Sequence, residues 1–386
     1  MLTVAIDIRR VNQFGFGTYL RNLVRTLGRL DGDNRYLLMG RPEQAAEMDA
    51  PGPRVELLPY PVPEASPRNL LQMPAVLRRA RVDVLHVPHY HWIPPLLPCP
   101  HVVTIHDLVE FIAPVAGRSH LVSRSLFNPV RRSVRQAARV VAVSEATRQD
   151  VLRVFGPRPE RVEVVYNAID ERFLAGHSSD AERQMVAARY AMHHPYILYA
   201  GNVQPHKNVE KLIEAFAVLK ADLAQSGEFP ELKLIVIGDE LSKHPHLRRT
   251  VVRTRQEANV RFLGFVPIEI LRVFYDGAKL FAFPSLYEGF GLPPLEAMAH
   301  GTPVVTSNLS SLPEVVGDAA VLVNPDNVFD IMRGLKQCLL DRPLRERLKE
   351  RGYLQVKRFS WERSTRRMIE IFEEVGRKRP AVGKSL

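Results

Sequence analysis

Hydrophobic residues fall into short apolar runs that alternate with longer amphipathic segments along the chain. Residues 2–8 and 196–200 are almost entirely apolar, which is typical of parallel strands buried on both faces. Residues 17–30 and 208–224 place apolar residues three or four positions apart, which predicts helices with one buried face. The alternation predicts an α/β fold built on open, mostly parallel sheets.

This pattern occurs twice, so the chain is predicted to form two domains. Strands are predicted in the first half at residues 2–8, 36–39, 54–58, 82–87, 101–105, 140–143 and 161–166. Strands are predicted in the second half at residues 196–200, 232–237, 260–262, 279–283, 302–306 and 320–323. A length of 386 residues also exceeds the usual size of a single hydrophobic core.

The segment over residues 176–194 is polar and rich in small residues, and a new strand follows it. This composition predicts a linker with a hinge. The predicted domains therefore cover residues 1–175 and 195–360. Residues 361–386 are predicted to form a final amphipathic helix with a mobile basic tail.

Residues 281–305 combine the end of a strand, a glycine turn and the start of a helix. Such an arrangement presents backbone N–H groups and the positive end of a helix dipole to an anion such as a phosphate. Glu288 precedes the turn, and Glu296 lies in the first turns of the predicted helix. Because carboxylates would repel a phosphate, we expect them to accept hydrogen bonds from hydroxyls of a ribose or a sugar ring. Ordinary capping of the helix is the alternative.

Lys207 occupies a similar position earlier in the second domain. It follows the strand at residues 196–200 and a turn at residues 201–206, and it directly precedes a helix. A lysine there is placed to contact a phosphate as a point charge, with an exposed lysine without a ligand as the alternative. Residues 263–266, after another strand, could offer backbone groups to a nucleobase.

In the first domain, candidate residues follow predicted strands at the edge where open parallel sheets bind ligands. Gly15 and Gly17 permit a close approach, but their spacing is not the GxGxxG of dinucleotide sites, so no nicotinamide cofactor is predicted. Histidines follow two further strands, at His89, His91 and His106, the last directly before Asp107. Packed or capping histidines are the alternative.

The sequence carries 53 Lys and Arg against 42 Asp and Glu, a net charge of +11. Arginines crowd residues 118–139 among apolar residues, a pattern typical of a basic amphipathic helix on anionic lipid. They are Arg118, Arg124, Arg131, Arg132, Arg135 and Arg139. A solvated outer helix is the alternative. No aromatic-rich strand platform or helix-turn-helix pattern accompanies the charge, so nucleic acid is not expected as a partner.

Cys99 and Cys338 provide no disulfide framework, and no Cys/His spacing resembles a zinc site. The chain starts directly with a strand-like segment and contains no apolar run of about 18 residues. We therefore expect a cytoplasmic protein, with peripheral attachment to the inner face of the membrane through residues 118–139 as a variant of that location.

Long segments of the chain resemble family 4 of the retaining glycosyltransferases, in particular the bacterial mannosyltransferases of O-antigen and exopolysaccharide assembly. The resemblance is strongest at residues 199–216, 260–305 and 307–325, and weaker at residues 14–23, 102–108 and 141–151. It implies the GT-B fold, in which two Rossmann-like domains present parallel sheets across a deep cleft. The N-terminal domain would take the acceptor and the C-terminal domain the nucleotide sugar, and the final helix would pack back toward the N-terminal domain.

The resemblance also implies roles for individual residues. Glu288 would contact hydroxyls of the donor sugar, Glu296 the ribose and Lys207 the diphosphate, while His106 matches a histidine that approaches the transferred sugar. The catalytic set is thus Glu288, His106 and Lys207. Further donor-site residues implied are Gly15, Gly17, Gly201, Asn202, Gly238, Phe265, Val266, Phe290, Gly291 and Leu292.

Asn202 departs from the family, because many members carry an arginine there. The diphosphate charge would then be met by Lys207, the helix N-terminus and Arg9 or Arg10. The implied reaction is a retaining transfer of a hexose, foremost mannose from GDP-mannose, to a hydroxyl of a glycan or lipid-linked acceptor. It needs neither cofactor nor metal, and the acceptor attacks on the face from which the diphosphate departs.

Other activities remain open from the sequence. The same fold could use another nucleotide sugar such as UDP-glucose, or act as a sugar-nucleotide epimerase or a phosphorylase. A phosphorylase would need a cofactor lysine, for which no motif is present. A basic binding protein with a vestigial site is the alternative outside enzymes.

Overall fold

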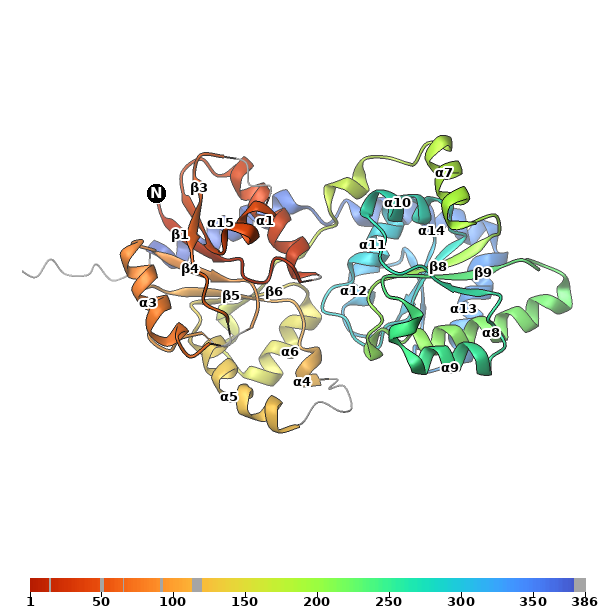
Figure 1. Cartoon of the computed structure of the whole chain (residues 1–386), viewed down its shortest axis with the longest axis horizontal. Coiled ribbons are helices and arrows are strands. Elements are labelled where there is room, and N and C mark those ends of the chain that lie inside the picture. The colour runs from red at the N-terminus through yellow and green to blue at the C-terminus, as the bar shows by residue number, and fades with distance from the viewer. Residues whose placement is uncertain (14, 49–51, 65, 91–92, 113–119, 378–386) are drawn as a thin grey trace, which may run out of the picture. The chain divides into compact units, whose positions relative to one another are not determined.

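The computed structural model describes residues 1–13, 15–48, 52–64, 66–90, 93–112 and 120–377, with only the backbone course at residues 120–126. The chain forms two compact units (Figure 1). Met1–Ala168 and Phe359–Leu386 make up the first unit, and Ile169–Arg358 make up the second. The sequence-based domain boundary at residue 175 lies a few residues after this division.

The first unit is built on a parallel sheet in the order β3-β2-β1-β4-β5-β6-β7. Its strands are β1 (Thr3–Asp7), β2 (Arg35–Gly40), β3 (Val55–Pro59), β4 (Val84–Val87), β5 (His101–Ile105), β6 (Arg139–Ala142) and β7 (Val162–Val164). Its helices are α1 (Phe16–Leu30), α2 (Pro42–Ala46), α3 (Asn69–Arg79), α4 (Val109–Ile112), α5 (His120–Gln136), α6 (Glu145–Phe155), the 3-10 turn η1 (Pro159–Arg161) and α15 (Trp361–Arg377).

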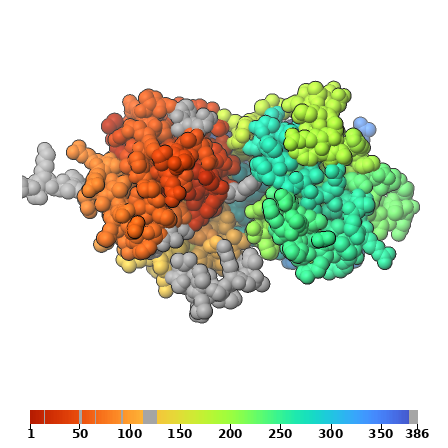
Figure 2. Space-filling model, viewed as in Figure 1, coloured from red at the N-terminus to blue at the C-terminus, as the bar shows by residue number. Residues whose placement is uncertain are grey.

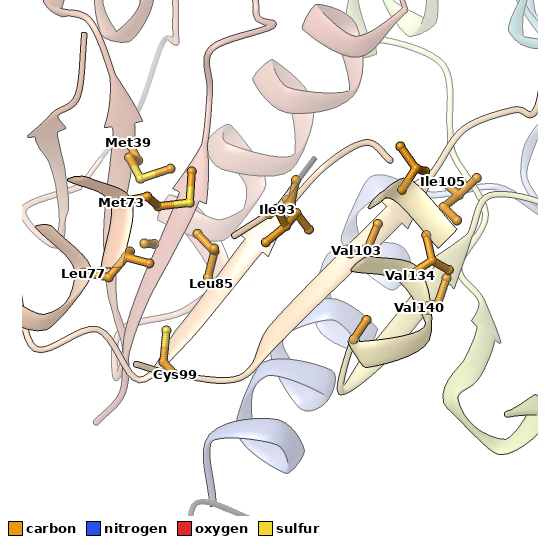
Figure 3. Packing of buried hydrophobic residues seen from close by; sticks show 14 of the residues in the cluster. Met39, Met73, Leu77, Leu85, Ile93, Cys99, Val103, Ile105, Val134 and Val140 are labelled. Atoms are coloured by element: carbon orange, nitrogen blue, oxygen red, sulfur yellow. The ribbon is translucent and has the colours of Figure 1, made fainter. Parts of the chain in front are cut away.

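Alternate residues of these strands enter two hydrophobic cores on opposite faces of the sheet, as the two-residue period of a strand requires. Ala5 belongs to the core under α3, α5 and α6, which Figure 3 shows, whereas Val4 and Ile6 belong to the core under α1 and α15. Helices therefore cover both faces, which explains why the strands are apolar throughout.

The predicted final helix is α15, and it packs on α1 in the first unit. Met368, Ile371 and Phe372 are buried in the same core as the residues of α1. The hydroxyl of Ser364 donates to the carbonyl of Tyr166 at 2.6 Å. The last described residues of the chain thus complete the core of the first unit.

The second unit contains a parallel sheet in the order β10-β9-β8-β11-β12-β13. Its strands are β8 (Tyr196–Ala200), β9 (Lys233–Ile237), β10 (Val260–Phe262), β11 (Leu280–Phe283), β12 (Val304–Ser307) and β13 (Ala320–Val323). Its helices are η2 (Glu171–Leu174), α7 (Asp180–Tyr190), η3 (Pro205–Lys207), α8 (Val209–Ser226), η4 (Leu241–Lys243), α9 (Pro245–Arg253), α10 (Ile268–Gly277), α11 (Leu292–Ala299), α12 (Leu312–Val316), α13 (Val328–Leu340) and α14 (Arg342–Val356). The two parallel sheets confirm the predicted fold class. Among the described residues, none of the helices is both long enough and apolar enough to cross a bilayer.

The predicted linker over residues 176–194 contains a helix, α7, which packs on α10 within the second unit. Its start is fixed by a capping box: Ser179 accepts from the backbone of Glu182, and the Glu182 carboxylate accepts from the backbone of Ser179. This segment, yellow-green in Figure 2, lies on the surface of its unit, which accounts for its polar composition. Polarity alone therefore did not distinguish a surface helix from a linker.

Strand pairing brings three loops of the second unit to one edge of its sheet. β8 lies between β9 and β11 and is parallel to both. The turns after β8, β9 and β11 consequently emerge together at the carboxyl edge, where open α/β sheets bind ligands.

Candidate active site

Lys207 ends the turn that follows β8, and its loop is tied to the end of β11. The next residue, Asn208, is in the left-handed conformation at φ 62°. Its side chain donates to the carbonyl oxygens of Pro284, at 3.0 Å, and Pro325, at 2.8 Å. Because Pro284 directly follows β11, these bonds fix Lys207 beside the neighbouring strand.

The ammonium of Lys207 lies 2.7 Å from each carboxylate oxygen of Glu288. The two side chains are only 16% and 10% exposed, so the ion pair is largely withdrawn from solvent. The same ammonium lies 5.5 Å from the centre of the Phe283 ring, whose face attracts a cation. Removing either partner would leave a nearly buried charge uncompensated.

Two serines hold the backbone at Glu288. The N–H of Glu288 donates to the Ser310 hydroxyl at 3.2 Å, and this hydroxyl donates back to the Glu288 carbonyl. The Ser311 hydroxyl lies 3.0 Å from that carbonyl and 2.7 Å from the carbonyl of Phe290. The loop after β12 therefore fixes the backbone from which the Glu288 side chain reaches Lys207.

The glycine turn closes directly onto helix α11. Gly291 caps the helix at φ 109°, a conformation that favours glycine. A Cβ on Gly291 would lie 2.7 Å from Leu312 Cδ2, so packing also excludes a side chain. Leu292 starts the helix and Phe290 is buried beside the turn. Pro293 and Pro294 in the first turn of α11 carry no N–H, so the backbone groups that can bind an anion at this helix start are the N–H groups of Gly291 and Leu292.

Glu296 lies on α11 and accepts a hydrogen bond from the buried hydroxyl of Tyr275 at 2.9 Å. Burial raises the pKa of Glu296 to about 7, the bond from Tyr275 lowers it, and the charge of Asp170 raises it. The carboxyl therefore changes charge near neutral pH, which makes it a strong or a weak hydrogen-bond acceptor according to pH.

The turns after β8 and β9 meet closely at the same edge. Gly201 and Gly238 both have positive φ, 148° and 134°, and a Cβ on Gly238 would lie 2.1 Å from the Gly201 carbonyl oxygen. Glycine at position 238 is therefore required for the close approach of the two turns. Asn202, which follows Gly201, has a buried side-chain oxygen with no hydrogen-bond partner in the described part of the chain.

Phe265 and Val266 follow β10. The Phe265 ring is 67% exposed, whereas Val266 is buried. Their loop joins the same edge, because the N–H of Gly238 donates to the carbonyl of Gly264 at 2.8 Å. The residues that the sequence assigned to the donor site in this unit therefore lie on the loops after β8, β9, β10 and β11 and on α11, and their contacts with a donor stay a prediction.

In the first unit, His106 lies against Phe16 and Tyr19 of α1, with ring centres 5.0 and 4.6 Å away. Its Nε2 is buried and has no hydrogen-bond partner among the residues that the structure describes. Burial lowers the pKa of His106 to about 3, and His89 acts in the same direction, so the ring is neutral. Gly15 caps α1 at φ 81°. Gly17 follows in its first turn, where a Cβ would lie 2.0 Å from the Val11 carbonyl oxygen.

Arg9 and Arg10 are engaged within the first unit. Arg9 contacts Asp7 at 2.6 Å and also donates to the Asn69 side chain, while Arg10 contacts Glu64 at 2.8 Å. Each arginine would have to exchange its carboxylate partner to meet the diphosphate, so that contact stays a prediction. Of the predicted histidines, His89 contacts the same Glu64 at 2.8 Å. His91 lies outside the described residues.

The predicted basic helix over residues 118–139 corresponds to α5 only as far as Gln136, because Arg139 is the first residue of β6, and the described arginines are not equivalent. Arg131 donates to the carbonyl of Phe155 at 3.2 Å, and Arg139 pairs with Glu374 at 3.2 Å. Arg132 and Arg135, three residues apart on one helical face, are exposed. Arg118 and the side chain of Arg124 lie outside the described residues.

Sequence reasoning missed the residues that position the site. Ser310, Ser311, Tyr275 and Asn208 act through backbone or carboxylate contacts that depend on the fold. A signal was present for Asn208 alone, because asparagine tolerates the left-handed conformation at the start of a helix.

Two family models match the chain. "Glycosyl transferases group 1" matches residues 180–378, and "Glycosyltransferase Family 4" matches residues 15–173. Among curated proteins, the chain is 35% identical over 273 residues to "O-antigen chain mannosyltransferase B" of Escherichia coli, covering 70% of each chain. It is 31% identical over 277 residues to "Serotype-specific mannosyltransferase WbdA" of Escherichia coli, covering 72% of this chain but only 34% of that one.

Solved structures share the whole fold. A Rickettsia africae glycosyltransferase covers 98% of this chain with a TM-score of 0.74 at 15% identity. The Anabaena protein HepE, in complex with UDP and glucose, covers 97% with a TM-score of 0.73 at 18% identity. These likenesses confirm the GT-B fold.

Replacing Ser310 by alanine removes both hydrogen bonds to the Glu288 backbone and should lower the free energy of unfolding by about 1–3 kcal/mol. Ser310→Gly should cost less, because Ser310 has φ 58°, where a Cβ is strained. Chemical denaturation measures both effects. Ser242→Ala, at an exposed serine, is the control and should change stability by less than about 0.5 kcal/mol. Equal stability of Ser310→Ala and the control would contradict this role.

Proposed function

Because the chain belongs to the family 4 glycosyltransferases, we propose that it transfers mannose from GDP-mannose to a hydroxyl of a glycan or lipid-linked glycan in surface polysaccharide synthesis. The named activities of its relatives from Escherichia coli support mannose as the transferred sugar. The observation that carries the proposal is the Lys207–Glu288 pair beside the glycine turn and the start of α11.

The site offers complementary groups to a nucleoside diphosphate sugar. Lys207 and the backbone N–H groups of Gly291 and Leu292 would bind the diphosphate, and Glu288 would accept hydrogen bonds from the sugar hydroxyls. Glu296 would accept from the ribose. The exposed ring of Phe265 and the backbone at Val266 would lie along the base.

Donor binding would require an exchange of partners at Lys207. In the free protein the ammonium of Lys207 is paired with Glu288, and both carboxylate oxygens lie 2.7 Å from it. A diphosphate would draw the ammonium away, and the released carboxylate would turn to the hydroxyls of the sugar. The Lys207 ammonium and the Glu288 carboxylate would each keep a polar partner during the exchange, so neither nearly buried charge would be left without one.

Transfer would follow from the same contacts. An oxygen of the acceptor hydroxyl forms a bond to the anomeric carbon as the bond from that carbon to the diphosphate breaks, and the hydroxyl proton passes to the departing phosphate oxygen. Lys207 and the N–H groups stabilise the charge that develops on the diphosphate. Attack on the face of departure gives retention, and no metal ion at the diphosphate is part of this scheme.

His106 of the first unit would contribute as a neutral ring. With a pKa of about 3 it carries no charge at physiological pH, and its unpartnered Nε2 is suited to a hydrogen bond with a sugar hydroxyl. Phe16 and Tyr19 hold the ring between them, so its orientation is fixed before a sugar binds.

We also propose that the first unit attaches the enzyme to the cytoplasmic face of an anionic membrane. Support comes from exposed Arg132 and Arg135 on α5 and from Leu71 on α3, which is 81% exposed. Both helices pack on the same face of the sheet. Part of α3 belongs to the orange surface in Figure 2.

The function is tested by incubating the protein with GDP-mannose and following the release of GDP, with water or added oligosaccharide as acceptor. We expect turnover with GDP-mannose, and Lys207→Ala should weaken GDP binding by about 1.5–3 kcal/mol through loss of a charge-assisted contact. Lys211→Ala is the matched control, since Lys211 pairs with Asp326 one helical turn further on. Turnover with UDP-glucose alone would favour the other donor, and no turnover with any nucleotide sugar would refute the activity.

GDP binding should also strengthen as pH rises from 6 to 8. Above its pKa of about 7, Glu296 is ionised and a better acceptor for the ribose, which corresponds to about fivefold in affinity. Calorimetry across this range measures the change, and Glu296→Gln should remove that component while leaving the titration of GDP itself. An unaltered pH profile in the variant would show that Glu296 does not hold the ribose.

Membrane attachment predicts sedimentation with vesicles that contain anionic lipid. Replacing Arg132 and Arg135 together by glutamine should weaken vesicle binding roughly thirtyfold, since each charge contributes about 1 kcal/mol. The pair Arg342→Gln and Arg347→Gln, at exposed arginines of the second unit, is the control. Equal binding of both double variants would refute this surface.

A further inference from the structure

His177, Asp276 and His300 come together in the second unit from three separate segments. His177 precedes α7, Asp276 lies near the end of α10, and His300 ends α11. The Nδ1 atoms of His177 and His300 lie 2.7 and 2.9 Å from the same oxygen of Asp276. The three candidate ligand atoms all lie within 4.8 Å of one another.

The cluster is ordered on every side. The other Asp276 oxygen accepts from the backbone N–H of Ser178 at 2.6 Å, and Nε2 of His177 lies 3.3 Å from the Tyr353 hydroxyl. Burial raises the pKa of Asp276, but the hydrogen bonds from His300, His177 and Ser178 outweigh burial and hold the pKa well below its usual value. The Asp276 carboxylate is therefore ionised, and the groups that donate hydrogen bonds to it are in place without a bound ligand.

The geometry points to a binding site for a divalent transition metal ion, with zinc as the best match, held by His177 Nδ1, His300 Nδ1 and Asp276. Zinc–nitrogen and zinc–oxygen bonds of about 2.0–2.2 Å in a tetrahedral site put two ligand atoms about 3.3 Å apart. To admit the ion, each imidazole would release its Nδ1 proton and move about half an ångström away from the carboxylate, and the two Nδ1 atoms would come to about 3.3 Å from each other.

Burial and ligand type decide which ion fits. His300 and Asp276 are 1% and 2% exposed, whereas His177 is 54% exposed, so the open side faces solvent and water can supply a fourth ligand. Two imidazoles with one carboxylate favour zinc over magnesium or calcium, which prefer oxygen ligands. The Asp276–Ser178 and His177–Tyr353 contacts are the outer hydrogen bonds that orient metal ligands.

Tyr275 links the cluster to Glu296, the proposed ribose contact. His300 stacks on Tyr275 with ring centres 5.9 Å apart and planes 13° apart, and the Tyr275 hydroxyl donates to Glu296. An ion on His300 would fasten the segment before α7 to the helix that carries Glu296. It takes no part in the transfer, and metal binding itself does not depend on the proposed donor.

The test uses the full chain freed of metal with a chelator and then titrated with zinc against a chromophoric chelator. We expect one ion per chain, a raised melting temperature, and visible absorption bands of a tetrahedral site with cobalt in place of zinc. His177→Ala, at an exposed position that should fold normally, should weaken binding roughly tenfold or more and abolish the cobalt bands.

The matched control is His194→Ala. His194 is also an exposed histidine beside a carboxylate, Glu231 at 3.5 Å, in the same unit but without a third ligand among the described residues. Wild-type behaviour of this variant, with loss in His177→Ala, supports the site. If the wild type does not bind zinc, or if all three proteins bind it equally, the metal site is refuted and the cluster is a purely hydrogen-bonded contact. If the protein binds zinc but does not turn over GDP-mannose, the proposed function is refuted and the metal site is not.

Discussion

The ion pair between Lys207 and Glu288 is the interaction on which the candidate site depends. It joins the loops after the neighbouring strands β8 and β11, which are also linked by the bond from Asn208 to Pro284 and by a backbone hydrogen bond from Leu286 to His206. The attraction within so little exposed an ion pair offsets the desolvation free energy of the two charges only if the geometry is good. Here both carboxylate oxygens contact the ammonium. Asn208 on one side and Ser310 on the other supply that geometry by fixing the two backbones.

This dependence explains the conformational outliers around the site. Asn208 and Ser310 both adopt positive φ, and Gly291 does so at the start of α11. Strained backbone of this kind persists where surrounding contacts over-determine it, and it costs stability of order 1–3 kcal/mol at each non-glycine residue. The contacts of Asn208 with two carbonyls and of Ser310 with Glu288 offset that cost. The site is therefore built before the ligand binds.

Much of this could be predicted from sequence because strands buried on both faces leave an unmistakable apolar run. The strands at residues 101–105 and 196–200, which are buried along their whole length, were predicted to the residue. Helix α7 was taken for a linker, because its outer face is polar and its capping box, Ser179 with Glu182, was overlooked. The His177, Asp276 and His300 cluster could not be predicted, because its members are far apart in the sequence and no short spacing marks them.

The asparagine at position 202 affects how the Lys207–Glu288 ion pair would respond to a diphosphate. With an arginine there, the site would hold two cations against Glu288, and one could bind a diphosphate while the other kept the carboxylate neutral. With Asn202, Lys207 is the cation that Glu288 holds at hydrogen-bond distance, and Arg9 and Arg10 are held by carboxylates of their own unit. In the proposed donor site a diphosphate competes with Glu288 for Lys207, and the exchange costs least when a ligand group takes the place of the ammonium at the carboxylate. Sugar hydroxyls do this and a bare nucleotide does not, so the exchange favours the complete donor over the released nucleotide.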